Sequence, residues 1–228
     1  MVSGRDEASL AEAAGEMRET TGAEVGYHVA DLSRAEDVRE LVGLTAERFG
    51  GVDVLVTNAG GPPAGSFDTV SDEDWRDAFE LNLMSVVRLI REALPHMREK
   101  GRGRILNVAS SSIKQPIENL ILSNTFRAGI AGLAKSLSFE LAPDGILVNT
   151  LGPGRISTER SAAMDASQAE KLGVAPEEVR GRVEAGIPLS RYGTPEEFAR
   201  VAVFLASPAN SYVTGQAFLV DGGMVRAL

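Results

Sequence analysis

The sequence of 228 residues contains no cysteine, and aromatic residues make up only 5% of it. The absence of cysteine excludes disulfide bonds, thiolate catalysis and metal sites with thiolate ligands, and it fits the reducing cytoplasm. Positive charge is also scarce, because 23 Lys and Arg stand against 32 Asp and Glu and give a net charge of −9. No local cluster of Lys and Arg offsets this charge, which argues against a nucleic-acid partner and against docking on anionic membranes.

Long apolar runs are absent too. None approaches the ~18 residues that a membrane-spanning helix needs, and Met1 is not followed by the basic and apolar regions of a signal peptide. Neither His28 nor His96 has ligand-type residues near it in the sequence, so we expect no metal site. The rest is ordinary for a globular protein, with 43% hydrophobic and 24% charged residues. We expect one domain over residues 1–228.

Helical and strand patterns alternate along the chain. Strands are predicted at residues 24–30, 52–57, 104–108, 146–151 and 217–220, and helices at 6–20, 35–49, 71–99, 119–141 and from Pro195. Residues 52–57 (VDVLVT) are almost all apolar, which favours a strand buried on both faces of a parallel sheet. The alternation predicts the α/β class, as a doubly wound parallel sheet in three layers.

In such sheets ligands bind beyond the carboxyl ends of the strands. The loops at that edge are residues 31–32, 58–63, 110–115 and 153–158, each of which follows a predicted strand. Residues 155–188 should cover the site and are a candidate lid. Their mixture of Lys, Arg, Asp and Glu specifies no particular substrate.

Several ordered motifs carry a resemblance to a known family. They are Asn58-Ala59-Gly60, Asn82 within a long helix, Ser110 after Asn107-Val108-Ala109, Pro153-Gly154, and Thr214-Gly215-Gln216 before Asp221-Gly222-Gly223. Together they make the chain resemble the short-chain dehydrogenase/reductase family, especially its 3-oxoacyl-(acyl carrier protein) reductase-like members. The resemblance covers about residues 5–223 and implies a Rossmann-like fold, a nicotinamide cofactor and a small carbonyl or alcohol substrate.

The resemblance also implies which residues bind the cofactor. They are Arg5, Asp31, Leu32, Asn58, Ala59, Gly60, Arg127, Pro153, Gly154 and Ile156. Asp31 matches the acid that receives the adenine amino group, and the Asn58 segment lies along the adenosine ribose. The guanidinium of Arg5 suits the 2′-phosphate of NADP, and Gly4 stands where an NAD-preferring enzyme has a carboxylate, so NADP is expected and NAD stays possible. The alternative is that Arg5 is merely solvated.

The sequence departs from the family at its start. The family begins with a strand, a Gly-rich turn and a helix that faces the cofactor pyrophosphate, a unit of roughly 30 residues, and no such unit is found here. We expect the chain to begin inside the family's second strand, as an N-terminally incomplete domain. Two strands would then flank a gap with unpaired backbone groups, at about 1–3 kcal/mol for each buried group. The isolated chain is therefore expected to fold poorly.

The expected catalytic residues are Asn82, Ser110, Ser123 and Arg127, and two of them depart from the family pattern. Ser123 occupies the position of the family's Tyr, 123 − 110 = 13 residues after Ser110, and Arg127 occupies that of its Lys. A Ser hydroxyl is a much weaker acid than a phenol, and an Arg with a pKa above ~12 relays no proton near neutrality. Ser110 either polarises a carbonyl or satisfies the loop backbone. Lys114 or Glu118 could replace the Tyr as proton donor, but Lys and Glu side chains are more often simply solvated.

Three hypotheses about function follow. The first is an NADP(H)-dependent oxidoreductase that acts on a carbonyl or alcohol. The second is a cofactor-binding or structural subunit with little catalysis, and the third is a truncated fragment without independent function. A homodimer or homotetramer is expected through residues 71–99 and 119–141, because Gly129, Ala131, Gly132 and Ala134 permit close approach of helices.

Overall fold

The computed structural model describes residues 1–227. Its main sheet has four parallel strands in the order β3–β4–β5–β6, with bounds Val54–Thr57, Gly103–Val108, Ile146–Pro153 and Ala217–Val220. Residues Val56, Leu106 and Asn149 lie side by side across the first three of these strands. The predicted parallel order of the three apolar segments is therefore confirmed.

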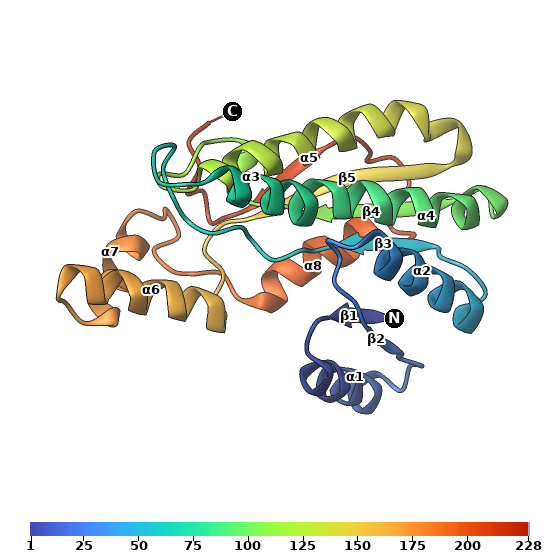
Figure 1. Ribbon diagram of the computed structural model, residues 1–228, viewed down its shortest axis with the longest axis horizontal. Coiled ribbons are helices and arrows are strands. Elements are labelled where there is room, and N and C mark those ends of the chain that lie inside the picture. Colours follow the sequence, from blue (N-terminus) through green and yellow to red (C-terminus); the bar gives the residue numbers. More distant parts are fainter. Residues whose placement is uncertain (228) are drawn as a thin grey trace.

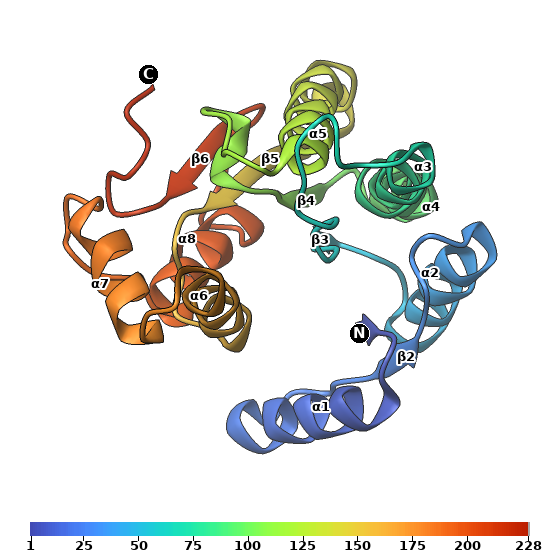
Figure 2. The same cartoon turned by 60° about the vertical axis from the view of Figure 1, so that its left-hand side comes forward.

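A separate two-stranded parallel sheet is formed by β1 (Val2–Gly4) and β2 (Tyr27–Val29). Figure 2 shows this pair and α1 (Glu7–Thr21) set apart from β3. Within residues 1–227, β1 pairs only with β2, and β3 pairs only with β4. This arrangement agrees with the predicted gap between two neighbouring strands. β2 is shorter than predicted, because only residues 27–29 pair with β1.

Helices cover both faces of the main sheet (Figure 1). On one face lie α2 (Ala35–Phe49), α4 (Ser85–Glu99) and α5 (Ile121–Glu140), whose apolar side chains form the largest core cluster with those of the strands. On the other face α8 (Pro195–Ala206) packs Leu205 against Leu106 and Leu151. The result is the predicted α/β, three-layer, Rossmann-like sheet. None of its helices is long and apolar enough to cross a membrane, over the residues described.

The prediction that residues 52–57 are buried on both faces is wrong. Leu55 packs into the core cluster beneath α2 and α4, but Val54 and Val56 are 45% and 50% exposed. The reason is that β3 is the outermost strand of the main sheet, and Leu205 of α8 packs against Leu106 of β4 and Leu151 of β5 instead. An apolar run shows that a segment is a strand, but not that both of its faces are covered.

The long helix predicted at residues 71–99 is divided into three parts. These are α3 (Asp72–Phe79), a π-helical turn at Glu80–Met84, and α4. A capping box lies at its start, since the Ser71 hydroxyl accepts from the Asp74 amide and the Asp74 carboxylate accepts from the Ser71 amide. The π-helical turn carries Asn82, and such turns often occur at functional sites.

The candidate lid contains two helices that were not predicted individually, α6 (Glu159–Leu172) and α7 (Pro176–Ala185). Thr158 and Ser161 form a capping box at the start of α6. Pro176 opens α7 at the position where its missing N–H does no harm. The two helices pack together beside the carboxyl ends of β3 and β5, as Figures 1 and 2 show.

Candidate active site

A cavity of about 780 Å³ opens at the carboxyl ends of β3, β4 and β5. Nine of the predicted site residues line it: Asn58, Ala59, Gly60, Ser110, Ser123, Arg127, Pro153, Gly154 and Ile156. The strands run parallel, so the loops that follow them meet at one edge of the sheet although they are far apart in the sequence. Asn82 lies behind this lining. Arg5, Asp31 and Leu32 do not border the cavity.

Arg127 is the most deeply buried cation of the site, with only 5% of its surface exposed. Its Nη1 donates to the carbonyl of Val108 at 3.1 Å, and its Nη2 donates to the carbonyl of Ala59 at 2.9 Å. The guanidinium thus joins the ends of β3 and β4. Burial, with a smaller effect from the charge of Arg160, lowers the pKa of Arg127 to about 10. A pKa of about 10 still lies well above neutral pH, so Arg127 is protonated there.

Asn82 is fully buried in the π-helical turn. Its Nδ2 donates to the carbonyl of Gly60 at 2.6 Å, which ties the turn to the loop after β3. Its Oδ1 is buried and has no hydrogen-bond partner among the described residues. A buried acceptor without a partner is costly, so this oxygen is suited to accept a hydrogen bond from a water molecule at the site.

The two serines reach the cavity from different elements. Ser110 follows β4, and its Oγ accepts a hydrogen bond from the amide of Ser112 at 3.1 Å. Ser110 therefore satisfies the loop backbone, which is one of the two roles that the sequence predicts for it. Its hydroxyl hydrogen remains available to a ligand, because that bond uses only an oxygen lone pair. Ser123 lies in the first turn of α5 and also lines the cavity.

The predicted adenine-side residues gather on the smaller sheet. Gly4 pairs with Val29, which brings Arg5 and Asp31 together just beyond the carboxyl ends of β1 and β2. The Asp31 carboxylate accepts from the hydroxyl and the amide of Ser33 at 2.7 and 3.0 Å. These bonds lower the pKa of Asp31, and the charge of Arg5 adds to the effect. Leu32 packs against the main core cluster.

Several cavity residues were not singled out from the sequence. Among them are Arg160 and Met164 of the lid, Phe198 of α8, and Met224 and Val225 near the end of the chain. Arg160 is one of the mixed charges of the lid, and no local pattern marks the apolar residues as a lining. Lys114 and Glu118 are exposed and do not border the cavity, in agreement with the solvated reading. Tyr27, Tyr192 and Tyr212 do not border it either.

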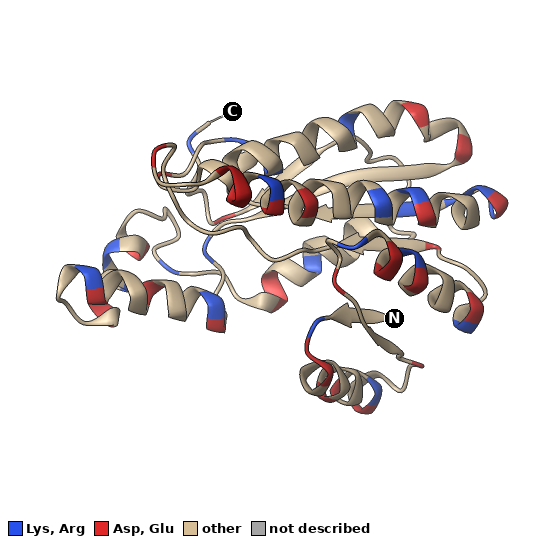
Figure 3. Ribbon diagram, in the orientation of Figure 1, with Lys and Arg blue, Asp and Glu red and all other residues tan. Residues whose placement is uncertain are grey.

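The electrostatics of the cavity differ from those of the molecular surface. Figure 3 shows basic and acidic residues interspersed over the outer helices. The cavity lining contains Arg127, Arg155 and Arg160, and no Asp or Glu occurs among the described residues that form it. Groups of three or more His, Cys, Asp or Glu that could hold a metal ion are absent from residues 1–227. All charged residues of the described lining are thus basic.

The family model described as enoyl-(acyl carrier protein) reductase matches residues 1–225. The chain belongs to this family of short-chain dehydrogenases/reductases. The 3-oxoacyl-(acyl carrier protein) reductase of Vibrio cholerae is 35% identical over 196 residues, which are 85% of this chain and 75% of that protein. As a short-chain dehydrogenase/reductase, the chain shares the fold of many solved structures.

Two of those structures are informative. L-sorbose reductase from Gluconobacter frateurii, complexed with NADPH and L-sorbose, superposes with a TM-score of 0.94 at 33% identity, over 99% of this chain and 86% of that one. An NADPH-bound short-chain oxidoreductase from Pseudomonas aeruginosa PAO1, described as containing an atypical catalytic center, gives a TM-score of 0.88 at 30% identity, over 99% and 86% of the two chains.

The residues of this short-chain dehydrogenase/reductase fit a nicotinamide dinucleotide. A Cβ on Gly60 would meet no atom within 4 Å, so the loop after β3 leaves open space beside the cavity. A Cβ on Gly154 would lie 2.6 Å from the Cα of Asp221, so only glycine lets the end of β5 approach the turn after β6 this closely. The absence of Asp and Glu from the described lining suits an anionic ligand.

Proposed function

We propose that the chain is an NADP(H)-dependent oxidoreductase that acts on a carbonyl or alcohol substrate, similar to the 3-oxoacyl reductases. The observation that carries this proposal is the convergence of Ser110, Ser123 and Arg127 on one cavity with the loops after β3 and β5. Membership of the family and the NADPH complexes of its solved relatives support the same conclusion.

The chain's own residues would orient the substrate and stabilise charge. When bound, the nicotinamide supplies the hydride that reduces the carbonyl carbon. The hydroxyls of Ser110 and Ser123, which both line the cavity, would donate hydrogen bonds to the carbonyl oxygen. The Arg127 guanidinium has five N–H donors, and two of them bind the backbone carbonyls of Val108 and Ala59. The remaining N–H groups can donate to the ribose hydroxyls. Because Arg127 stays protonated at neutral pH, the proton for the oxygen would come from water.

NADP is the proposed cofactor, with Arg5 as the residue that reads its 2′-phosphate. Arg5 is exposed just beyond β1 and lies close enough to Asp31 to affect its pKa. A guanidinium binds a phosphate with two parallel hydrogen bonds, which a ribose hydroxyl cannot match. Arg5→Ala should therefore weaken NADPH binding and leave NADH binding almost unchanged.

The experiment that tests the proposed function has two steps. NADPH binding is measured by titration, and NADPH oxidation is then followed with 3-oxoacyl thioesters and simple ketones. Ser110→Ala and Ser123→Ala should lower the rate with little change in NADPH affinity. Ser136→Ala is the matched control, because its hydroxyl donates to the carbonyl of Gly132 on the exposed side of α5. Binding without turnover by any carbonyl compound would favour a non-catalytic subunit instead.

We also propose a homodimer or homotetramer built through α4 and α5, in the cytoplasm. Gly129 and Gly132 lie on the exposed side of α5, whereas Ala134 is buried in the core and contributes nothing to that surface. A Cβ on Gly132 would meet no atom within 4 Å in this chain. Gly132→Arg should therefore leave the fold intact and shift the protein to monomer in light scattering. A wild-type protein that is monomeric at high micromolar concentration would refute the oligomer.

A further inference from the structure

The arginines of the lid and of the segment that follows it fall into two groups. Three lie outside the cavity and are ion-paired: Arg180 with Glu184 at 2.8 Å, Arg182 with Glu178 at 2.6 Å, and Arg191 with Glu197 at 2.7 Å. The other two, Arg155 and Arg160, line the cavity. Over residues 1–227 neither of them has a hydrogen bond or ion pair from its side chain. Arg155 is half-buried and Arg160 is exposed, and the described lining that they share holds no Asp or Glu, which suits an anionic ligand.

Arg160 reaches across the cavity. It is the second residue of α6, and its Nη2 lies 2.6 Å from the place that a Cβ on Gly61 would occupy, so the guanidinium rests against the loop after β3. A cation is disfavoured at the N-terminus of a helix, because the helix dipole is positive there. Arg160 also lies close enough to Arg127 for their charges to repel. Both effects would be relieved by an anion between the two guanidinium groups.

Arg155 approaches the same space from the loop after β5. It is half-buried between Gly154 and Ile156, which also line the cavity. Apolar side chains complete the lining beside it, among them Ile117, Met164 and Phe198. The cavity lining therefore combines apolar side chains with two arginines that form no ion pair, an arrangement that suits an organic molecule with one anionic group.

We propose that Arg160 and Arg155 bind an anionic group of the substrate, a carboxylate or a phosphate, so that this reductase acts on anionic carbonyl compounds. The inference rests on the proposed function and names its substrate class. Guanidinium groups bind carboxylates and phosphates with the same paired hydrogen bonds. The phosphates of the cofactor have that chemistry too, so the experiment must separate the two sources.

The experiment uses ketones in pairs that differ only in charge. The pairs are 4-oxopentanoate with its methyl ester, and dihydroxyacetone phosphate with dihydroxyacetone. Wild type should prefer the anion in at least one pair. Arg160→Met should raise the KM for that anion about ten- to hundredfold, the size expected for loss of a charged hydrogen bond, and leave the neutral partner unchanged. The KM of Arg160→Lys for that anion should lie between those of wild type and Arg160→Met, because lysine keeps the charge but not the paired hydrogen bonds. Arg155→Met should act in the same direction.

Calorimetry of the same anions with the cofactor-free protein provides a readout that does not depend on turnover. Arg160→Met should abolish the binding, and Arg182→Met, a matched change on α7 outside the cavity, should retain it. If no carbonyl compound is reduced but Arg160-dependent anion binding persists, the proposed function fails and the anion site stands. Equal preference of wild type within both pairs would overturn the proposal. So would an Arg160→Met variant that loses affinity for NADPH while its preference between anion and neutral ketone stays unchanged.

Discussion

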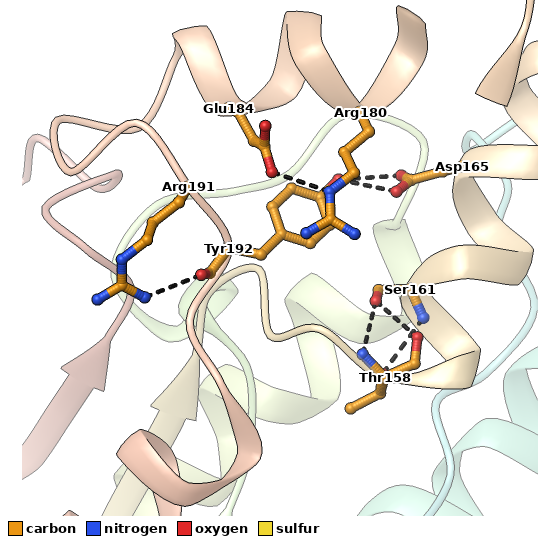
Figure 4. Close-up of polar contacts among 7 residues, drawn as sticks. All are labelled: Thr158, Ser161, Asp165, Arg180, Glu184, Arg191 and Tyr192. Atoms are coloured by element: carbon orange, nitrogen blue, oxygen red, sulfur yellow. Dashed lines mark hydrogen bonds and ion pairs between the residues drawn. The ribbon is translucent and has the colours of Figure 1, made fainter. Parts of the chain in front are cut away.

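The phenol of Tyr192 donates to the carboxylate of Asp165, with its oxygen 3.0 Å from both carboxylate oxygens. Both residues are buried, Tyr192 with 3% and Asp165 with 5% of their surface exposed. Figure 4 shows that Asp165 comes from α6 and Tyr192 from the segment before α8, and that Arg180 of α7 lies over the Tyr192 ring. The guanidinium carbon of Arg180 is 4.6 Å from the ring centroid. This cluster fastens both lid helices to the body of the protein beside the cavity.

Removal of the phenol oxygen should destabilise the lid. Tyr192→Phe leaves the Asp165 carboxylate buried without its hydrogen-bond donor, at a cost of about 1–3 kcal/mol or more for a charged group. Asp165→Asn should cost less, because its amide oxygen can still accept from the phenol. Urea unfolding of the two variants and wild type measures the difference. Equal losses in the two variants would show that the carboxylate charge is satisfied in another way.

The same pair predicts a response to alkaline pH. Burial, and next the hydrogen bond to Asp165, raise the pKa of Tyr192 from 10.0 to about 12. The unfolded chain therefore loses this proton at lower pH than the folded chain, and the stabilisation is complete below about pH 10 and lost between pH 10 and pH 12. The stability of wild type should fall across that window relative to Tyr192→Phe. Parallel curves for the two proteins in pH-dependent urea unfolding would contradict this prediction.

Acid should weaken a second contact beside the site. The hydrogen bonds from Arg191 and from the Thr194 amide lower the pKa of Glu197 from 4.5 to about 2. The carboxylate is therefore easier to protonate in the unfolded chain, and its stabilisation is present above pH 4.5 and lost as the pH falls toward 2. Glu197→Gln should lower the melting temperature at pH 7 and have a smaller effect near pH 2. An equal effect at both pH values, measured by calorimetry, would exclude the carboxylate charge as the cause.

Restoring the family's proton donor should increase carbonyl reduction. The double change Ser123→Tyr with Arg127→Lys supplies a phenol and a cation that lowers its pKa, and general acid catalysis contributes about 10²–10⁴-fold. Ser123→Tyr alone should help less, because the Arg127 guanidinium is held by the carbonyls of Val108 and Ala59. Initial rates at saturating NADPH measure both effects. If the wild-type protein already reduces carbonyls rapidly and the double change lowers that rate, the chain has its own proton donor.

Much of the fold could be predicted from local signals. The apolar runs identified β3, β4 and β5, and Pro195 marked the start of α8. The ordered motifs also located nine residues of the cavity lining. Such signals depend on a few neighbouring residues and on the rule that ligands bind where parallel strands end. The expectation of one domain over residues 1–228 stays a prediction.

Contacts between residues far apart in the sequence were decided only by the tertiary structure. Arg127 meets the carbonyl of Ala59 across 68 positions, and Tyr192 meets Asp165 across 27. Arg160 rests against Gly61, and the exposure of Val54 and Val56 follows from the place of β3 at the edge of its sheet. The sequence by itself determined which segments become strands and helices, because backbone preference and apolar spacing are local. Which charges remain unpaired in the cavity depends on how those elements pack, and packing involves the whole chain at once.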